Sequence, residues 1–283
     1  MHVTSQLDTP QVRVFDFRCC AEPHEAPFPE VHDSHSLSFV RQGSFGYHLR
    51  GRSFDLVAGS FLIGRQGDEF ICTHDHHAGG DRCLSFHLAP ELVDELGDRS
   101  VMWRTGALPP LAEMVVLGEL AQCAAEGLTS VSVDEVGMLI GRRFVELVGG
   151  KKMSGTAPSA RERQRAIRGA AWIEAHAHEP IDLVGAATEA GLSPFHFLRV
   201  FRRVTGVTPH QYLLRIRMRR AARLLTEQER PVTDVAYEAG FADLSNFVRT
   251  FHRAAGLSPS AFRACAHGKR NFLQVGRDPA AQH

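Results

Sequence analysis

The sequence predicts an α+β protein with two unlike domains, and three observations support this prediction. Short segments of strand character, separated by Gly and Asp clusters at roughly ten-residue spacing, fill the first part of the chain, which is typical of a β-barrel or jelly roll. Beyond residue 160 the apolar periodicity is helical throughout. Between these parts lies GGKKMSGTAPSA at 149–160, whose small polar residues are typical of a linker.

We therefore expect an N-terminal β-barrel or jelly-roll domain with added helices over 1–150, a linker over 151–160 and an all-α domain over 161–283. A chain of 283 residues with 43% hydrophobic residues is long enough for each domain to have a separate core. Neither a signal peptide nor an apolar run long enough to span a bilayer is evident, so a cytoplasmic protein is expected.

The strands of the N-terminal domain are expected in SLSFV, FGYHLRG, SFDLV, SFLIG, EFICTH and CLSFHL. Helical patterns follow at 90–97, 109–127 and 132–148, the last opened by the capping-box pair Ser132 and Glu135. The last two helices carry apolar residues that a small barrel would not obviously cover, and we expect them to form the interface of a homodimer. These residues are Met114, Leu117, Met138 and Phe144.

A Cys/His cluster is predicted in FICTHDHHAGGDRCLSFHL, residues 70–88. Gly79-Gly80 fits a two-residue type I′ hairpin turn, which would pair His76 with Cys83 and His74 with Ser85. Cross-strand partners share a face, so Cys72, His74, His76 and Cys83 would project together. Thiolate and imidazole donors suit Zn²⁺ or another borderline-soft divalent cation.

Two other interpretations of the N-terminal domain remain open. The Cys/His face can be a solvated polar face, with a small organic effector bound inside the barrel instead. The pair His74 and His76 also has the H-x-H spacing of metal-dependent jelly-roll enzymes, which makes an enzyme fused to a second domain the alternative function.

The C-terminal part contains a repeat. GLSPFHFLRVFRRVTGVTP at 191–209 returns as GFADLSNFVRTFHRAAGLSP at 240–259, offset by 49 to 50 residues. Gly191 and Gly240 fall where a helix ends in a left-handed residue, Pro194 suits a first helical turn and Asp243 an N-cap. Each copy therefore predicts a helix-turn-helix unit, over about 181–206 and about 232–256.

The second helix of each unit has an apolar face and a polar face. Phe197, Leu198 and Phe201 are expected inside the first unit, and Phe247 and Phe251 inside the second. The polar faces are expected to meet the major groove of DNA. They carry Phe195, His196, Arg199 and Arg202 in one unit, and Ser245, Asn246, Arg249 and Arg253 in the other.

The two units are joined by HQYLLRIRMRRAARLLTEQ, a helical pattern rich in arginine. Arg219 in this segment is expected to contact a DNA phosphate. The zero net charge of the chain also hides an asymmetry: residues 1–160 have 13 Lys+Arg and 21 Asp+Glu, a net −8, whereas residues 161–283 have 19 and 11, a net +8. A basic C-terminal half beside an acidic N-terminal half indicates that the C-terminal part binds a polyanion.

Residues 165–264 resemble the DNA-binding domain of the AraC/XylS family of transcriptional regulators. The resemblance lies in GLSPFHFLRVFRRVTGVTPHQYLLRIRMRRAARLL and VTDVAYEAGFADLSNFVRTFHRAAGLSPSAFR. It implies a seven-helix domain whose two recognition helices enter successive major-groove segments of promoter DNA, with RNA polymerase as a further partner. The N-terminal domain more loosely resembles the cupin-type effector and dimerisation domain of that family, which implies that it binds an effector. With the Cys/His cluster, this effector is expected to be a small organic molecule or a metal. No enzymatic activity is expected, because no acidic residue follows His74 and His76 at the distance usual in metal-dependent jelly-roll enzymes.

Overall fold

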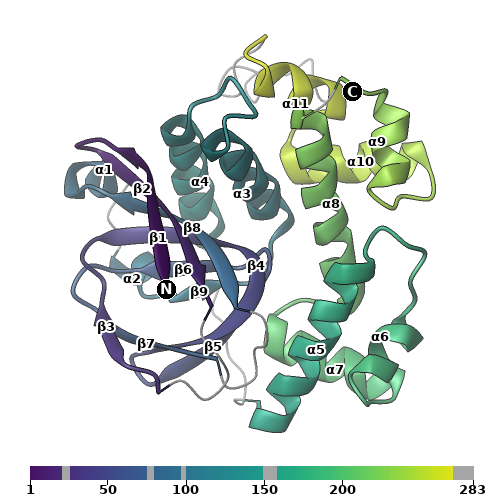
Figure 1. Cartoon of the computed structure of the whole chain (residues 1–283), viewed down its shortest axis with the longest axis horizontal. Coiled ribbons are helices and arrows are strands. Elements are labelled where there is room, and N and C mark those ends of the chain that lie inside the picture. The colour runs from purple at the N-terminus through teal and green to yellow at the C-terminus, as the bar shows by residue number, and fades with distance from the viewer. Residues whose placement is uncertain (21–25, 75–79, 97–99, 149–157, 228, 270–283) are drawn as a thin grey trace.

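A computed structural model describes residues 1–20, 26–74, 80–96, 100–148, 158–227 and 229–269, with the side chains of Ser100, Val101 and Phe195 excepted (Figure 1). An antiparallel sheet domain comes first and a helical domain follows. The predicted α+β class is therefore confirmed. None of the helices in the described ranges is long and apolar enough to cross a membrane.

The N-terminal domain has two antiparallel sheets that share one long strand, β4 (His35–Leu49). The first half of β4 pairs with strands of one sheet, and its second half pairs with strands of the other. The change occurs at a register shift between Val40 and Gln42, followed by Gly43 with a φ of 76°. The first sheet has the order β1 (His2–Asp8), β2 (Val12–Cys19), β8 (Asp81–Leu88), β4, β6 (Phe61–Gly64) and β9 (Ala107–Leu108). The second contains β5 (Arg52–Val57), β7 (Glu69–Thr73) and β3 (Pro29–Val31) beside β4.

Two predictions about these strands are wrong. Of the two forms predicted, a β-barrel or a jelly roll, the closed barrel is excluded, since β1 and β9 are the open ends of the first sheet among the described strands. The predicted hairpin pairing of His74 with Ser85 does not form, because Ser85 on β8 pairs with Phe15 of β2 and Ser38 of β4, while β7 pairs with β3 and β4. The 15-residue β4 provides β7 and β8 each with a partner in a different sheet. The other predicted pair includes His76, which lies outside the described residues.

The expected helices of this domain are present as α1 (Pro90–Glu95), α3 (Ala112–Ala125) and α4 (Val133–Val148), with a short α2 (Ser100–Trp103) between the first two. Helices α3 and α4 lie directly on aromatic rings of the first sheet. A Cβ at Gly118 would lie 2.6 Å from the ring of Phe39, and one at Gly137 would lie 2.7 Å from Phe86 Cδ1. Glycine at these positions allows the close approach.

The described C-terminal part contains seven helices, as the family resemblance implies. A capping box of Ser159 and Glu162 opens the first. The helices are α5 (Ala160–His176), α6 (Leu183–Glu189), α7 (Pro194–Thr205), α8 (Pro209–Glu227), α9 (Val232–Glu238), α10 (Leu244–Ala255) and α11 (Pro259–Ala266).

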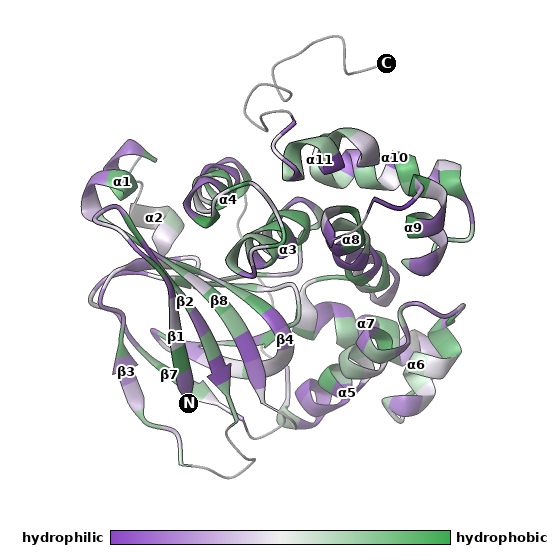
Figure 2. Cartoon of the chain, turned by 45° about the horizontal axis from the view of Figure 1, so that its top comes forward, coloured by the Kyte–Doolittle hydropathy of each residue, from purple (hydrophilic) through white to green (hydrophobic). Residues whose placement is uncertain are grey.

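The two parts of the chain share one hydrophobic cluster, so their cores are not fully separate, although a second cluster lies within the N-terminal domain alone. Figure 2 shows α3 between α4 and α8. One continuous cluster contains Phe86 of the sheet, Leu120 of α3, Leu225 of α8 and Phe251 of α10, all fully buried. The apolar stripe of α8 packs against α3, which the linear pattern could not reveal.

This packing also corrects the expected dimer interface. Met114 and Phe144 are fully buried within the single chain, and Leu117 is half-buried against the same cluster. Met138 on α4 differs, since 52% of it is exposed. Helix α3 is therefore covered by α8, and α4 retains an exposed apolar residue.

Candidate nucleic-acid interface

Both helix-turn-helix units have the left-handed glycine that the repeat predicts. Gly191 follows α6 with a φ of 63°, and Gly240 follows α9 with a φ of 94°. The chain then returns its next amide to the preceding helix, from Leu192 N to Ala187 O and from Phe241 N to Ala236 O, each at 3.0 Å. The turns are thus equivalent, as expected for helix ends of this type.

The second helix of each unit is capped at both ends. The Ser193 side chain accepts a hydrogen bond from His196 N before α7, and Asp243 accepts one from Asn246 N at 2.7 Å before α10. Pro194 occupies the first turn of α7. The predicted roles of Pro194 and Asp243 are confirmed.

The inner faces of α7 and α10 are anchored by phenylalanines. Phe197, Phe201, Phe247 and Phe251 have no exposed surface. The prediction for Leu198 is wrong: it is 40% exposed, and the fully buried Val200 completes the apolar face in its place. Positions 197, 200 and 201 follow the i, i+3, i+4 spacing that one helix face requires.

The outer faces carry polar side chains, and Arg199 and Arg249 occupy equivalent positions. Arg199 and Arg202 on α7 are exposed, as are Ser245, Arg249 and Arg253 on α10. His196 and Asn246 are half-buried beside the caps. The Asn246 Oδ1 atom accepts hydrogen bonds from Arg249 Nη2 at 3.4 Å and Thr250 Oγ1 at 3.3 Å, which orients the amide. Phe195 lies in the first turn of α7, but its side chain is outside the described part.

Arg219 does not belong to this surface. It is 9% exposed, its Nε atom lies 3.4 Å from Glu119 Oε2, and its guanidinium lies 5.3 Å from the centre of the Phe39 ring. A further hydrogen bond goes to the carbonyl of Arg41. The expected phosphate contact is therefore wrong for this arrangement, because the N-terminal domain covers this side of α8.

Other arginines of α8 also bind within the chain. Arg217 donates to the carbonyls of Ala177 and Glu179 at 2.8 Å each, which satisfies the end of α5. Arg223 lies 3.1 Å from Glu119 and 2.6 Å from Glu126. Burial alone would lower the pKa of Arg223, but the hydrogen bond to Glu126 and the charge of Glu119 raise it overall. The arginine-rich pattern thus serves largely to hold α8 in place.

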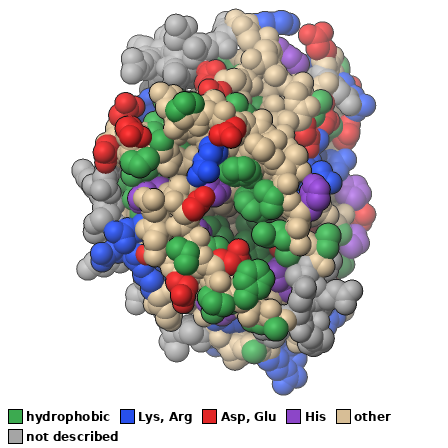
Figure 3. All heavy atoms as spheres, turned by 60° about the vertical axis from the view of Figure 1, so that its left-hand side comes forward, with side chains coloured by type: hydrophobic (Ala, Val, Ile, Leu, Met, Phe, Trp, Pro, Cys, Tyr) green, Lys and Arg blue, Asp and Glu red, His purple; other side chains and the backbone are tan. Residues whose placement is uncertain are grey.

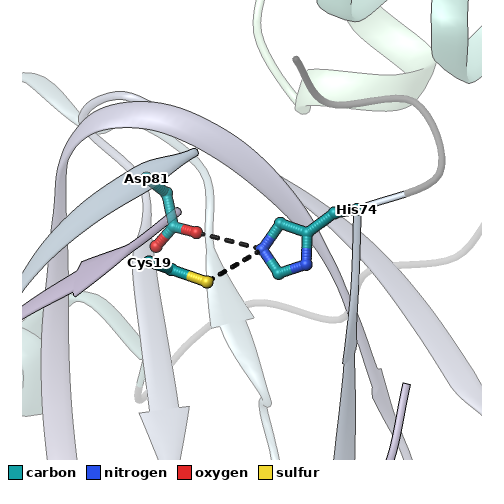
Figure 4. Close-up of side chains that lie close together, drawn as sticks. All are labelled: Cys19, His74 and Asp81. Carbon is teal, nitrogen blue, oxygen red and sulfur yellow. Dashed lines mark hydrogen bonds and ion pairs between the residues drawn. The ribbon is translucent and has the colours of Figure 1, made fainter. Parts of the chain in front are cut away.

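The expected Cys/His cluster is rearranged. His74 Nε2 lies 3.2 Å from Asp81 Oδ1 and 3.6 Å from Cys19 Sγ (Figure 4). Atoms of these three side chains all lie within 4.8 Å of one another. Sequence patterns missed Cys19 and Asp81, because their proximity depends on β2 pairing with β8, where Cys19 lies opposite Asp81.

The other described residues of the expected metal site, Cys72 and Cys83, are not among these three, although Cys83 Sγ lies 3.5 Å from Asp81 Oδ2. Cys72 is half-buried on β7 and Cys83 is buried on β8. Burial is the main cause that raises the pKa of both thiols, followed by the charge of Glu30 for Cys72 and of Asp81 for Cys83. His76 lies outside the described residues.

A buried histidine lies between the two sheets. His32 Nε2 is 2.9 Å from the Tyr47 hydroxyl, and its ring stacks on Phe70 at 4.1 Å between centroids. Burial lowers the pKa of His32 to about 4, so this imidazole is neutral at physiological pH. Figure 3 looks onto this domain from the side of β1 and β3 and shows a hollow bordered by hydrophobic side chains.

A polar cleft of about 630 Å³ lies where β2 begins and β8 ends. Its lining includes Arg13, Asp33, Ser34, His35, Gln66 and His87. His87 Nδ1 lies 2.8 Å from Ser34 Oγ and 3.2 Å from Asp33 Oδ1. The cleft therefore offers both hydrogen-bond donors and hydrogen-bond acceptors to a small molecule.

Two capped helix-turn-helix units joined by a single helix define a double helix-turn-helix DNA-binding protein. Residues 186–264 match a family model described as a helix-turn-helix domain. The transcriptional activator RhaS of Shigella boydii is 26% identical over 265 residues, which cover 88% of this chain and 91% of that protein. The chain is thus similar over most of its length to a transcriptional activator, and over residues 186–264 to a family of helix-turn-helix domains.

One solved structure is similar to the C-terminal part of this chain, and another is similar to most of it. The DNA-binding domain of AdpA, solved with a target DNA, is 35% identical and covers 38% of this chain and 96% of that one, with a TM-score of 0.36. An apo form of ToxT from Vibrio cholerae is 13% identical, covers 92% of this chain and 98% of that one, and has a TM-score of 0.37.

Proposed function

We propose that this regulator reads two successive major-groove segments through α7 and α10. The observation that carries the proposal is the equivalence of Arg199 and Arg249. Each is exposed, and each lies six residues after the N-cap of its helix, Ser193 or Asp243. An arginine so placed can form a bidentate pair with guanine.

The spacing of the two helices supports the same proposal. Helix α8 has 19 residues, which at 1.5 Å per residue span about 28 Å. With the widths of the units added, this agrees with the roughly 34 Å between successive major-groove segments on one face of DNA. His196, Arg202, Ser245, Asn246 and Arg253 would contribute neighbouring contacts, with Phe195 against a thymine methyl.

The N-terminal domain would receive the effector, either a small organic molecule or a metal. The polar cleft lined by Arg13 and His87 and the group around His74 are the two places that support this role. We further propose that the protein acts in the cytoplasm without catalytic activity, dimerises through α4 and contacts RNA polymerase at the promoter. The similarity to a transcriptional activator supports the contact with RNA polymerase, and the exposed Met138 supports a dimer through α4.

Selection of binding sites from random duplexes tests the reading of bases. The full chain should select one sequence, and Arg199→Ala and Arg249→Ala should each lose preference at a different position, by about 1–3 kcal/mol. Arg142→Ala is the control, since Arg142 is an exposed arginine on α4. Unchanged base preferences in both recognition-helix variants would contradict the assignment.

A further inference from the structure

Three side chains from three separate segments meet where the two sheets adjoin (Figure 4). Cys19 ends β2 and Asp81 begins β8, and the two face each other in the register of the first sheet. His74 follows β7, a strand of the second sheet. Its imidazole points at both the thiol and the carboxylate. The group therefore joins the two sheets at one end.

The spacing of the donor atoms matches a tetrahedral cation. Zinc–sulfur, zinc–nitrogen and zinc–oxygen bonds of about 2.3, 2.05 and 2.0 Å at tetrahedral angles separate sulfur from nitrogen by about 3.5 Å and nitrogen from oxygen by about 3.3 Å. The distances from His74 Nε2 are 3.6 Å to Cys19 Sγ and 3.2 Å to Asp81 Oδ1. Two of the three separations that three metal ligands require are thus already present, and the third, between the sulfur and the carboxylate oxygen, is within 4.8 Å.

The backbone beside two of the three donor residues, Cys19 and Asp81, is closely packed. A Cβ at Gly80 would lie 2.1 Å from the carbonyl oxygen of Cys19, and one at Gly43 would lie 2.0 Å from the carbonyl oxygen of Gly80. Cys19 of β2, Gly80 before β8 and Gly43 of β4 are therefore in direct backbone contact beside the donor atoms of Cys19 and Asp81. Such rigid support holds ligands in place before a cation arrives.

We propose that Cys19, His74 and Asp81 bind one divalent transition-metal cation of the Zn²⁺ class, and that this cation is an input of the regulator. The second part rests on the proposed function. Thiolate, imidazole and carboxylate form a mixed donor set that borderline cations prefer. The Cys19 thiol releases its proton to solvent on binding. Cys83, whose Sγ lies 3.5 Å from Asp81 Oδ2, is the candidate for the fourth position.

A short route leads from this group to the DNA-binding part. Asp81 pairs with Gly43 on β4, and Arg41 lies two residues before Gly43 at the register shift. The carbonyl of Arg41 accepts a hydrogen bond from Arg219 on α8. The guanidinium of Arg41 lies 2.8 Å from the carboxylate of Glu126, which follows α3. A cation that fixes Asp81 therefore acts on the strand that holds α8.

Metal titration of the full-length protein tests the site. Protein purified without an affinity tag is stripped with a chelator and titrated with Zn²⁺, and with Co²⁺ as a spectroscopic probe of thiolate ligation. We expect one equivalent per chain, and an affinity at least about tenfold lower for Cys19→Ser and for Asp81→Asn. Cys20→Ser is the matched control, since Cys20 is the adjacent, exposed cysteine.

Circular dichroism of the stripped variants shows whether they fold, and Asp81→Asn preserves the shape of the side chain. A wild-type protein that binds no Zn²⁺ at micromolar concentration, or folded variants that bind it as tightly as the wild type, would overturn the site.

Affinity for a selected operator, measured with and without Zn²⁺, tests the role as an input. We expect at least about a fivefold change in the wild type and none in Cys19→Ser. Stoichiometric Zn²⁺ with an unchanged operator affinity would overturn this role. If the protein selects no DNA sequence with or without Zn²⁺, the proposed function is refuted instead. The metal titration still decides whether the three side chains bind a cation.

Discussion

The carboxylate of Glu119 on α3 and the guanidinium of Arg219 on α8 form a buried ion pair between residues one hundred positions apart. Glu119 is 4% exposed and Arg219 is 9% exposed. Arg223 approaches the same carboxylate at 3.1 Å. The N-terminal domain thus holds the helix that connects the two DNA-reading units.

Glu119→Ala should lower the free energy of unfolding by at most about 3–5 kcal/mol, because it removes the carboxylate that Arg219 and Arg223 share. Arg219 keeps Glu174 at 3.8 Å and Arg223 keeps Glu126 at 2.6 Å, which limits the loss. Urea unfolding measures this loss. The paired replacement Glu119→Leu with Arg219→Met should cost less than Glu119→Ala alone, since it removes both buried charges. An equal or larger loss in the paired variant would show that the ion pair does not account for the effect.

Asp243→Ala should destabilise α10 by about 1 kcal/mol, because it removes the N-cap hydrogen bond to Asn246 N. The same change should weaken operator binding, since Asn246 and Arg249 depend on an ordered first turn. Thermal unfolding and a mobility-shift titration measure the two effects. Ser245→Ala, on the same turn but without a capping bond, should leave the stability unchanged within about 0.5 kcal/mol.

Stability should fall as the pH is lowered from 7 towards 4, and His32 should contribute to this fall. The pKa of His32 is lowered to about 4 in the folded chain, mainly by burial and against the opposing charge of Asp68. Below the usual pKa of about 6.5 the unfolded chain takes up a proton that the folded chain does not, which costs up to about 3 kcal/mol. His87 opposes and Asp33 favours the charged form as well.

His32→Gln should reduce that pH dependence, as measured by unfolding at pH 7 and pH 5. Glutamine retains a donor for the Tyr47 hydroxyl but does not titrate. His210→Gln, at an exposed histidine on α8, provides the comparison. If the free energy of unfolding changes equally between pH 7 and pH 5 in the wild type and in His32→Gln, the pH dependence does not come from His32.

If the protein dimerises through α4, Met138→Asp should shift it to monomers, because Met138 is the 52% exposed apolar residue of that helix. Sedimentation at tens of micromolar measures the change. Val184→Asp introduces the same charge at a 55% exposed position of α6 and should leave the dimer intact. Dissociation by both variants would indicate a general effect of charge instead of an interface on α4.

The features that sequence reasoning identified are those with local causes. A glycine turn, a Ser or Asp cap and a three-to-four residue apolar spacing lie within one segment, so Gly191, Asp243 and the anchors Phe247 and Phe251 could be predicted. The outer faces of α7 and α10 follow from the same periodicity. The prediction for Leu198 is wrong because α7 buries Val200 instead. Both residues are apolar, so hydrophobicity alone does not distinguish the buried one from the exposed one.

The features that could not be predicted depend on contacts between distant segments. The division of β4 between two sheets decides which strands β7 and β8 meet, and therefore which side chains surround His74. The burial of Arg219 likewise depends on α3, a hundred residues earlier. An arginine-rich helix predicts a charged surface equally well whether its partner is a phosphate or a carboxylate of the same chain.

The hydrophobic cluster shared by α3, α8 and α10 restricts how this protein can evolve by recombination. A DNA-reading half taken from a related regulator would have to bring side chains that fit Leu120 and Phe86 of this N-terminal half. A mismatched hybrid would expose the apolar side of α8 to water. Exchange of intact halves between relatives should therefore succeed only when the residues of both helices are inherited together.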